Sequence, residues 1–431
     1  MLEKLTSFTN KEFIWQPLIA LIMNVKKWIT LTVFSLLLVA ILGVLLRYKI
    51  SFSIPLINQK YLQHSHSHFA MSGWVSQCLM VLLASTVSSS FNEAHFKKYN
   101  FILWLNLGIA YGMLLSFLFQ GYGTYSIILS TLSLLAVFYF GIQLWRDMNK
   151  AAVRKACFIW YKAAILFNIL SAIGIAELAY IMATHIFDIK LQQATTYFFL
   201  HFQYNGWFIF ACLGLGIELL NQKQIQIKGL RNFFWIYALG CVPAYLLSVL
   251  WLPLPLWMYI IVILAALSLI SGWVWFLLQI LKQLPAFTLN MPLVSRRLFA
   301  CAGIAFTIKV ILQAGSTIPS LNHLAFGYRP IVIGYLHLVF LGIVTLFLLG
   351  YLFYMGYLSI HRIRKLGVTL FVIGIILNEL MLMMHGLTAM GYYTMPYINE
   401  MLLGITLLML TGVILIIIKT PRLSSIQEDY V

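Results

Sequence analysis

Long apolar runs separated by short polar loops constrain this chain more than any other feature of its sequence. A helix that crosses a lipid bilayer needs about 20 apolar residues, and twelve runs of that order follow one another along the 431 residues. Only 9% of the residues are charged, against about 25% in soluble domains. We therefore predict an all-α polytopic membrane protein in which residues 1–431 form a single transmembrane domain. The twelve predicted segments are 28–47, 67–90, 100–120, 124–145, 157–184, 196–220, 232–253, 256–281, 298–316, 330–357, 366–390 and 397–418.

The basic residues alternate between the predicted loops. Of the 28 Lys and Arg residues, 21 lie on one side of the predicted bundle, five lie on the other side and two lie within segments. Lys and Arg concentrate on the cytoplasmic side of membrane proteins. We therefore expect a multi-pass protein of the cell (inner) membrane, in contact with membrane lipid, with both termini cytoplasmic. The net charge of +17 follows from this loop bias, so we expect no nucleic-acid partner. The five residues on the outer side are Arg47, Lys49, Lys60, Lys190 and Arg329.

The cysteines and the first apolar segment carry no sign of secretion or of a zinc site. None of the five cysteines forms a C-x-x-C pair, and all lie in or beside apolar segments, as expected for packing residues. The first segment is too long for the core of a signal peptide, so we expect a retained helix. The cysteines are Cys78, Cys157, Cys212, Cys241 and Cys301.

A histidine-rich stretch, 61–74, opens the second segment at its outer end. It carries His64, His66 and His68. In a helix, His64 and His68 share a face and His66 points roughly opposite. Imidazole is the commonest protein ligand for metals, and polar rings at lipid depth are costly to place. The stretch is therefore a candidate ligand site; the alternative is a histidine-rich outer loop.

Further histidines lie at the same side of the predicted membrane. His201 is one turn into the sixth segment, His337 is two turns into the tenth, and His385 is near the outer end of the eleventh. Polar residues follow His201 directly, so a hydrogen-bonding patch between helices is an equal alternative there. His337 stands among aliphatic residues, and we favour a ligand role for it. Gly334 and Gly342 leave room beside its helix for a flat group.

Four other ionisable residues lie in or near the apolar segments. Lys309, Glu379 and Glu177 are functional candidates because charges inside a membrane are costly. We expect a Lys309–Glu379 ion pair, with a proton path as the alternative. Glu218 lies close to a segment end, and we expect it to reach water.

The number of segments and the placement of their histidines resemble subunit I of the haem-copper oxidases and the nitric oxide reductases. Twelve helices with both ends inside, and histidines on helices 2, 6 and 10 near the outer surface, are that family's pattern. The chain is similarly close to the NnrS-type membrane proteins, whose helix 2 carries a stretch like His66-Ser-His68-Phe-Ala-Met-Ser-Gly73. The resemblance covers the whole chain in topology but only three short motifs in sequence.

The resemblance implies a set of cofactor ligands. His68 and His337 match the two histidines that clamp a low-spin haem, and His201 matches a copper ligand. Tyr335 stands where the family has a second haem-binding histidine, and tyrosine ligates haem iron in catalase. Arg329, at the mouth of the tenth segment, is a candidate partner for haem propionates.

The chain also departs from the family pattern. The seventh segment contains no histidine, whereas the family has two adjacent copper-binding histidines there. The family's tyrosine four residues after the helix 6 histidine is Asn205 here. An ordinary oxygen-reducing haem-copper centre is therefore not expected. His64, His66, His201 and His385 remain candidates for a second metal, iron or copper, because nitrogen ligands suit both.

We therefore expect a haem-binding membrane protein of the oxidase subunit I type with an incomplete binuclear site. The expected role is electron transfer or the handling of nitric oxide or oxygen, with a cytochrome or oxidase subunits as partners, and whether the chain is an oxidoreductase enzyme stays open. One alternative is a twelve-helix secondary transporter, although residues 1–215 and 216–431 show no repeat of each other and the histidines lie away from the midplane. Another is a non-catalytic membrane partner that kept the fold and lost the cofactor.

Overall fold

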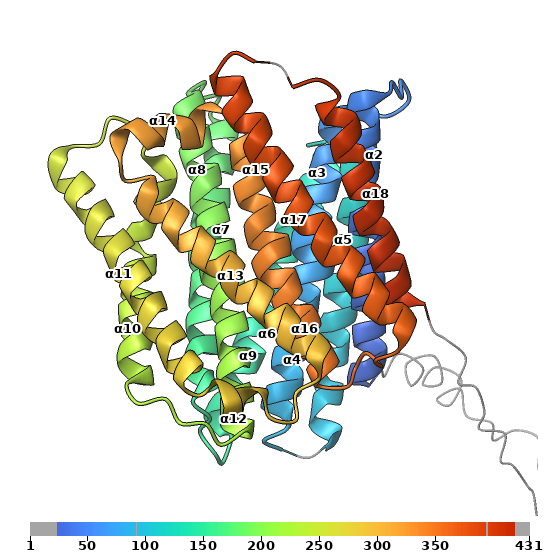
Figure 1. The fold of residues 1–431 in the computed structure, drawn as a ribbon, viewed down its shortest axis with the longest axis vertical. Coiled ribbons are helices and arrows are strands. Elements are labelled where there is room, and N and C mark those ends of the chain that lie inside the picture. Colours follow the sequence, from blue (N-terminus) through green and yellow to red (C-terminus); the bar gives the residue numbers. More distant parts are fainter. Residues whose placement is uncertain (1–23, 92, 394, 419–431) are drawn as a thin grey trace, which may run out of the picture.

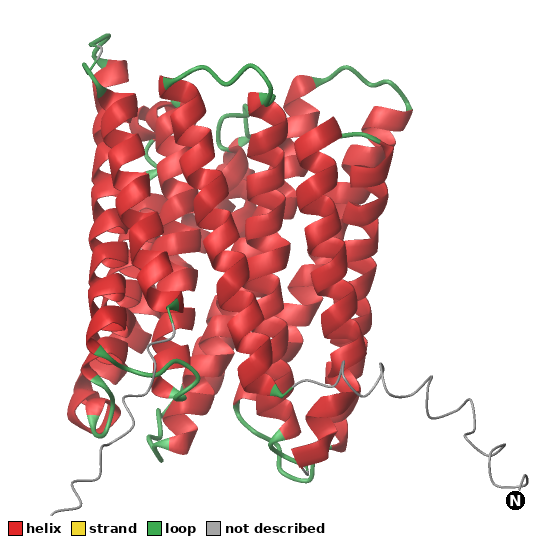
Figure 2. Ribbon diagram, turned by 90° about the vertical axis from the view of Figure 1, so that its right-hand side faces the viewer, coloured by secondary structure: helices red, strands yellow, loops and turns green. Residues whose placement is uncertain are grey.

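A computed structural model shows a bundle of roughly parallel helices (Figures 1 and 2). The structure describes residues 24–91, 93–393 and 395–418, and this part of the chain contains no strand. Ten of its helices are long and apolar enough to cross a membrane, or eleven if one bent pair counts as a single span. The fold is therefore a polytopic membrane bundle. The terminal segments, whose cytoplasmic location is predicted, lie outside the described residues.

Eleven of the twelve predicted segments coincide with a helix or a continuous helical stretch of the described residues. The segment predicted at 232–253 is broken, because Pro243 lacks the N–H that a continuing helix needs. The two pieces meet at 41°. The segment predicted at 196–220 is helical but is not among the ten candidate spans; Gln203, Tyr204 and Asn205 interrupt its apolar sequence.

The described helices pack as three consecutive groups of four, which we call units 1, 2 and 3. In each unit the first helix packs on the second and the third packs on the fourth. The fourth helix of each unit packs on the first helix of the next, and the last helix, α18, packs on α2, so the three units close into a ring. Unit 1 contains α2 (Val25–Ser51), the stretch α3 (Gln59–Phe69), η1 (Ala70–Ser76) and α4 (Gln77–Ser88), the short η2 (Glu93–Tyr99), α5 (Asn100–Gln120) and α6 (Thr124–Lys150).

Units 2 and 3 repeat this order. Unit 2 contains α7 (Cys157–Ala183), the stretch α8 (Ile189–His201), η3 (Phe202–Phe208) and α9 (Ile209–Gln222), the bent pair α10 (Leu230–Cys241) and η4 (Pro243–Val249), and α11 (Leu256–Lys282). Unit 3 contains α13 (Leu293–Gly315), the stretch α15 (Arg329–His337), η5 (Leu338–Thr345) and α16 (Leu346–Tyr354), then α17 (Arg362–Met390) and α18 (Ile398–Ile417). Two short helices connect them, α12 (Leu284–Thr288) and α14 (Pro319–Gly327).

We name the two ends of the bundle after these connecting helices. The α14 end lies at the top of Figure 1 and the α12 end at the bottom. The second stretch of each unit runs from the α14 end to the α12 end. Asn58 caps α3 and Asp188 caps α8, each through a side chain that accepts two backbone N–H groups, while Pro330 begins α15 at a position that suits proline. The three stretches therefore start at one end and carry their histidines at a similar depth.

The three second stretches meet at the centre of the ring. The indole of Trp74 donates to the Thr345 hydroxyl at 2.9 Å, and the indole of Trp207 donates to the Ser76 hydroxyl at 3.3 Å. Segments η3 and η5 also touch each other. Buried side chains from all three units belong to one hydrophobic cluster, so the centre of the bundle is a continuous core.

Candidate functional site

A π-helical segment follows a histidine in the second stretch of every unit. Each segment contains a widened turn, a feature that occurs often at functional sites. A glycine stands five residues after the histidine in all three, and each segment packs on the first helix of its unit. The repeated pattern therefore marks three equivalent positions near the centre of the molecule. The pairs are His68 and Gly73 in η1, His201 and Gly206 in η3, and His337 and Gly342 in η5.

Helix α3 presents its histidines on two faces, as its spacing predicts. His68 stacks on Phe117 with ring centres 4.2 Å apart, and its Nε2 lies 3.0 Å from the Tyr122 hydroxyl. His64 meets the edge of the same Tyr122 ring at 4.6 Å. Both side chains therefore face α5 and the loop after it. His68 lies in an aromatic cluster within unit 1, on the face away from His66.

His66 lies on the other face of α3, toward α2. A Cβ at position 43 of α2 would lie 3.4 Å from the Cε1 atom of His66, an ordinary van der Waals contact. Its charge neighbour on α2 is Arg47, and its Nδ1 is buried without a hydrogen-bond partner. A buried ring nitrogen without a partner is costly in a folded protein. The Nδ1 atom of His66 is therefore an unpartnered ring nitrogen in the interior, although the ring also interacts with the backbone of Val39.

The charge of His337 interacts with the charges of His66 and Arg47. The Nδ1 atom of His337 lies 2.9 Å from the carbonyl oxygen of Ile333. A ring nitrogen that donates to a backbone carbonyl orients the imidazole and leaves Nε2 for a ligand, the usual arrangement in metal-binding histidines. Helices α3 and α15 thus direct His66 and His337 into one region. His385 on α17 shares the neighbour Arg47.

Hydrogen bonds hold α3 and α15 together above and below these two histidines. Toward the α14 end, Arg329 donates to the Gln63 side chain at 2.7 Å. Toward the α12 end, Trp74 donates to Thr345. Arg329 was predicted as a partner for propionates, and the structure places it on the same pair of helices as His66 and His337. We call His66, His337, Arg47 and His385 the α3–α15 cluster.

Packing around this cluster is loose, whereas packing below it is tight. Along α15 the consecutive residues 331–333 and 335–337 are all partly exposed. Because successive residues point 100° apart, the helix is not closely covered on any side. In η5, by contrast, Val339, Val344 and Thr345 are at most 1% exposed. The half of the stretch that carries His337 is therefore less completely buried than the half that follows it.

His201 has the opposite environment. Its side chain is 1% exposed, its Nε2 lies 2.9 Å from the Cys241 carbonyl oxygen, and Asn205 lies 3.1 Å from its Nδ1. Both ring nitrogens thus have partners. Gln203, two residues on, donates to Asn168 and Ser171 of α7. The polar patch after His201 therefore joins helices of unit 2, which was the alternative weighed for this motif.

Lys309 lies beside this network, and its predicted ion pair does not form. The Nζ atom donates to Gln313 on its own helix at 2.9 Å, and the residue is 1% exposed. Glu379 instead accepts from Asn378, its neighbour in sequence. The prediction failed because Lys309 points toward His201 and Cys241 in unit 2. We call His201, Asn205, Cys241, Lys309 and Gln313 the η3 core.

Tyr335 faces unit 2 and not the α3–α15 cluster. Its ring centre lies 6.3 Å from that of Tyr204, and its other charge neighbour is Tyr237 on α10. Tyr335 and His337 are two residues apart and therefore point to opposite sides of α15. The structure does not bring Tyr335 together with His66 and His337.

The four histidines proposed for a second metal do not form one group. In residues 24–91, 93–393 and 395–418, no three His, Cys, Asp or Glu side chains come together in a way that would hold a metal ion. The reason is geometric. His64 faces α5, His201 is bonded within unit 2, and only His66 and His385 share a neighbour, Arg47.

The ion pairs of the described residues gather at the α12 end. Asp147 binds His95 at 3.0 Å and also contacts Lys98 and the Tyr99 hydroxyl. Glu218, which was expected to reach water, is 4% exposed and pairs with Lys155 at 2.9 Å. That expectation was wrong because the loop before α7 folds Lys155 back over the end of α9. These pairs connect helices and lie away from the histidine clusters.

Comparison with known proteins identifies no relative. No model of a protein family matches the chain, and a search of curated proteins gives no significant match.

The α3–α15 cluster is suited to a group that needs two imidazoles and a cation partner. A haem held by two histidines requires one free nitrogen from each ring, and the unpartnered Nδ1 of His66 and the open Nε2 of His337 provide them. Haem propionates pair well with guanidinium groups, which Arg47 and Arg329 carry. A bare metal ion held by protein alone usually needs three or four ligands, and this cluster does not provide them.

Two features of this site were not found from the sequence. Arg47 was counted as a loop residue because it ends an apolar segment. The equal spacing of histidine and glycine in three stretches was also missed, because the search for repeats compared halves of the chain. A search with a period of a third of the chain would have found it, since His68, His201 and His337 are 133 and 136 residues apart.

Proposed function

We propose that this chain is a haem-binding membrane protein of the haem-copper oxidase subunit I type, with twelve spans and cytoplasmic termini, that carries out electron transfer. The observation that carries the proposal is that His66 and His337 lie on two central stretches, α3 and α15, which the hydrogen bond from Arg329 to Gln63 joins. The ring of three four-helix units supports the proposal that the chain has twelve membrane spans. The bias of Lys and Arg toward the loops of the α12 end supports the orientation.

His66 and His337 are the proposed axial ligands. The sequence resemblance implied His68 in place of His66, but the contacts of His68 with Phe117 and Tyr122 favour His66. A haem bound here would be held by these two imidazoles and would supply single-electron transfer. The Ile333 carbonyl orients the His337 imidazole, and His66 lies against α2 at Gly43.

Arg47 and Arg329 are proposed to bind the propionates. Arg47 lies in the last turns of α2, and Arg329 begins α15, the helix that carries His337. Two cations at one end of the site fix the orientation of a group that carries two carboxylates on one edge. The two arginines also neutralise the negative charge of the propionates, which would be costly to place in the apolar bundle without a partner.

Reduction of oxygen at a haem-copper centre is not part of the proposal. The bent pair α10–η4 contains no histidine, and both nitrogens of His201 are already bonded. A respiratory role therefore needs a partner that accepts the electron, such as a cytochrome or an oxidase subunit. A role in nitric oxide or oxygen binding requires that one axial histidine leave the iron.

A secondary transporter is the weaker alternative. Many transporters consist of two related halves with a site at the interface between the halves. Here three units with one shared motif divide the chain, and the candidate ligands lie toward one end of the bundle. The threefold order supports the oxidase-type fold over a two-half transporter.

A reduced-minus-oxidised visible spectrum of the purified protein tests the proposal. We expect a haem spectrum in the full chain, lost in His66→Ala and in His337→Ala. His68→Ala is the matched control, two residues away on the same helix, and should keep the spectrum. Loss in His68→Ala with retention in His66→Ala would move the ligand to the other face of α3. A stable protein without haem, after growth with haem supplied, would refute the proposal.

A further inference from the structure

Two histidines of α3 lie one turn apart on the face that the proposed haem site does not use. His64 and His68 both contact Tyr122, which follows Gly121 in the loop between α5 and α6. Histidines at positions i and i+4 of a helix share one face and can bind one metal ion together, as they do in the H-E-x-x-H zinc motif. The structure therefore places two imidazoles and a phenol together at the α14 end of unit 1.

The polar atoms of these three side chains lie at separations that suit a metal ion. The Nε2 atom of His68 lies 3.0 Å from the Tyr122 hydroxyl oxygen. Two ligands of a tetrahedral zinc ion lie about 3.3 Å apart, because each bond to the metal is about 2.0–2.1 Å long. The Nε2 atom of His64 is buried without a hydrogen-bond partner, which is costly in a folded protein. His68 and Tyr122 are thus already close to the separation of two ligands, and His64 has a free nitrogen as the third.

Packing holds this group in place on the side that faces the bundle. Phe117, which is fully buried, stacks on the His68 ring with ring centres 4.2 Å apart. The Ser65 hydroxyl donates to a backbone carbonyl of α5 at 2.7 Å, which joins α3 to α5. Gly121 has a φ of +60°, and a Cβ there would overlap the ring of Tyr61, so the loop lies directly against the first turns of α3. The helix and the loop that carry the three side chains are therefore fixed relative to each other.

Tyr122 gives a metal ion access from outside the protein. Its side chain is 57% exposed, and its ring centre lies 4.6 Å from that of His64. The Ser126 hydroxyl lies within hydrogen-bond distance of the carbonyl oxygens of Gly121 and Gly123, which fixes the backbone on both sides of Tyr122. Rotation of one exposed side chain therefore uncovers the buried nitrogen of His64 without a change in the fold.

The types of ligand select the class of metal. No Asp, Glu or Cys side chain of residues 24–91, 93–393 and 395–418 joins the two histidines, and the exposed Lys60 lies one turn before His64. Calcium and magnesium ions bind mainly to carboxylate oxygens, which this group does not contain. Imidazole nitrogens suit zinc, copper, iron and nickel. The group therefore favours a divalent transition metal over a hard cation.

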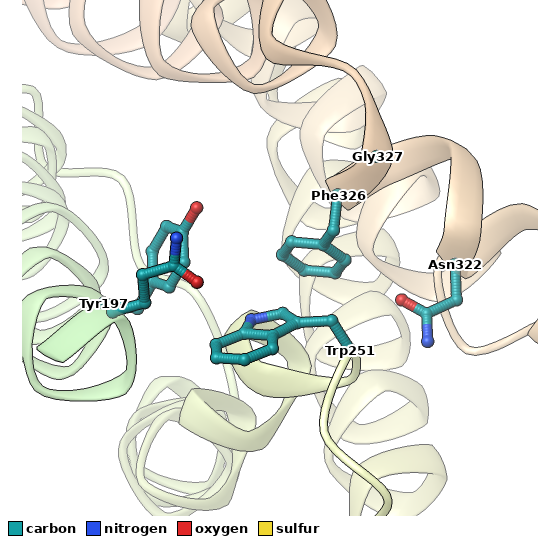
Figure 3. Close-up of a pocket in the computed structure, with 6 residues that line it drawn as sticks. Tyr197, Trp251, Asn322, Phe326 and Gly327 are labelled. Carbon is teal, nitrogen blue, oxygen red and sulfur yellow. The ribbon is translucent and has the colours of Figure 1, made fainter. Parts of the chain in front are cut away.

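The equivalent positions of the other two units lack this pair. Four residues before the histidine of the repeated motif, unit 1 has His64, unit 2 has Tyr197 and unit 3 has Ile333. In unit 2, Tyr197 lines a pocket together with Phe326 and Trp251, as Figure 3 shows, and none of the residues that line this pocket is His, Cys, Asp or Glu. The paired imidazoles are thus a feature of unit 1 and not of the repeated motif.

We propose that His64, His68 and Tyr122 bind one divalent transition metal ion of the zinc class, with a water molecule as the fourth ligand. Both imidazoles bind as neutral rings. Tyr122 binds as a phenolate, so its hydroxyl proton passes to water when the ion enters, and no electron is transferred. The bound ion ties the loop between α5 and α6 to α3, on the face opposite His66. The site is therefore separate from the proposed haem site and does not depend on it.

Calorimetric titration of the purified full chain in detergent with Zn²⁺, without a histidine tag, tests the site. We expect one equivalent of zinc to bind, about a hundredfold more weakly in His64→Ala and in His68→Ala and about tenfold more weakly in Tyr122→Phe, because even the loss of a partner beyond the ligands costs roughly 10–100-fold. His185→Asn is the matched control. It removes an exposed histidine at the same end of the bundle, and asparagine tolerates the positive φ of that position, so zinc should bind as in the unchanged chain. Equal affinity in all four variants would mean adventitious binding to surface histidines and would overturn the proposal.

Absorption of bound Cu²⁺ gives a second measurement, which reports the ligands directly. A phenolate ligand produces a charge-transfer band in the copper-minus-apo difference spectrum, and we expect this band in the full chain and not in Tyr122→Phe. Because Tyr122 is exposed, this variant carries the test if an alanine variant at His64 or His68 fails to fold. A band that persists in Tyr122→Phe would overturn the proposed ligand set. Zinc binding by a chain that holds no haem would support this site and refute the proposed function, whereas haem binding without zinc binding would refute this site alone.

Discussion

The α3–α15 cluster and the η3 core contain histidines at equivalent positions of a repeated motif, yet their hydrogen bonding differs. His201 has partners on both ring nitrogens and is 1% exposed. His66 has a buried nitrogen without a partner, and His337 uses only its own helix for a bond. A histidine whose two ring nitrogens are both hydrogen-bonded can serve only as a packing residue, whereas one with a free nitrogen can be a ligand. The shared motif does not distinguish the two cases.

The largest difference in stability between the two regions is expected when His201 and His337 are each replaced by leucine in the haem-free protein. His201→Leu leaves the Cys241 carbonyl and the Asn205 amide without a partner, and we expect a loss of about 2–5 kcal/mol of stability. His337→Leu removes only a bond to its own helix and should cost below about 1 kcal/mol. Thermal unfolding in detergent measures both. Equal losses would show that His337 is as tightly integrated as His201.

The next largest difference in stability is expected when a glycine of each region is replaced by alanine. A Cβ at Gly206 would lie 2.4 Å from the Cβ of Phe167, so Gly206→Ala forces α7 and η3 apart. We expect a loss of about 1–3 kcal/mol from this overpacking. A Cβ at Gly43 would meet His66 at 3.4 Å, an ordinary contact, and Gly43→Ala should be close to neutral. A tolerant position 206 would contradict the tight packing of the η3 core.

The smallest effect is expected from two cations, the partly exposed Arg47 and the buried Lys309. Arg47→Met should weaken haem retention about tenfold, equivalent to about 1.4 kcal/mol, because a charge-assisted bond to a propionate is lost. Lys309→Met is the matched control in the η3 core. It removes a cation with one amide partner and should leave haem retention unchanged. Haem loss from both variants on dilution, followed by absorbance, makes the comparison. A similar loss in both would place the haem near the η3 core.

Much of the fold could be predicted because apolar length and loop charge act locally. Hydropathy alone located the helical segments, of which ten, or eleven with the bent pair, are long and apolar enough to cross a membrane. The break at Pro243 has a local cause that was overlooked. The π-helical turns could not be predicted, because they depend on contacts among three helices from distant parts of the chain. Trp74 and Thr345, for example, are 271 residues apart.

The sequence predicted which residue types form the candidate site, but it identified only some of the individual residues. The face shared by His64 and His68 follows from helical spacing, and it was predicted. The choice between His66 and His68 depends on Tyr122 and Arg47, which belong to other helices and other faces. The Lys309–Glu379 pair failed for the same reason, since the direction of a side chain around a helix is set by its tertiary neighbours.

The two indole hydrogen bonds at the centre, Trp74 to Thr345 and Trp207 to Ser76, have a consequence for motion. They join the inner stretches of units 1, 2 and 3 at one level. A tilt of any one stretch therefore moves the other two, whereas an outer helix can tilt without breaking either bond. Breathing of the bundle is thus confined to its rim, and the inner helices respond to a ligand as one rigid body.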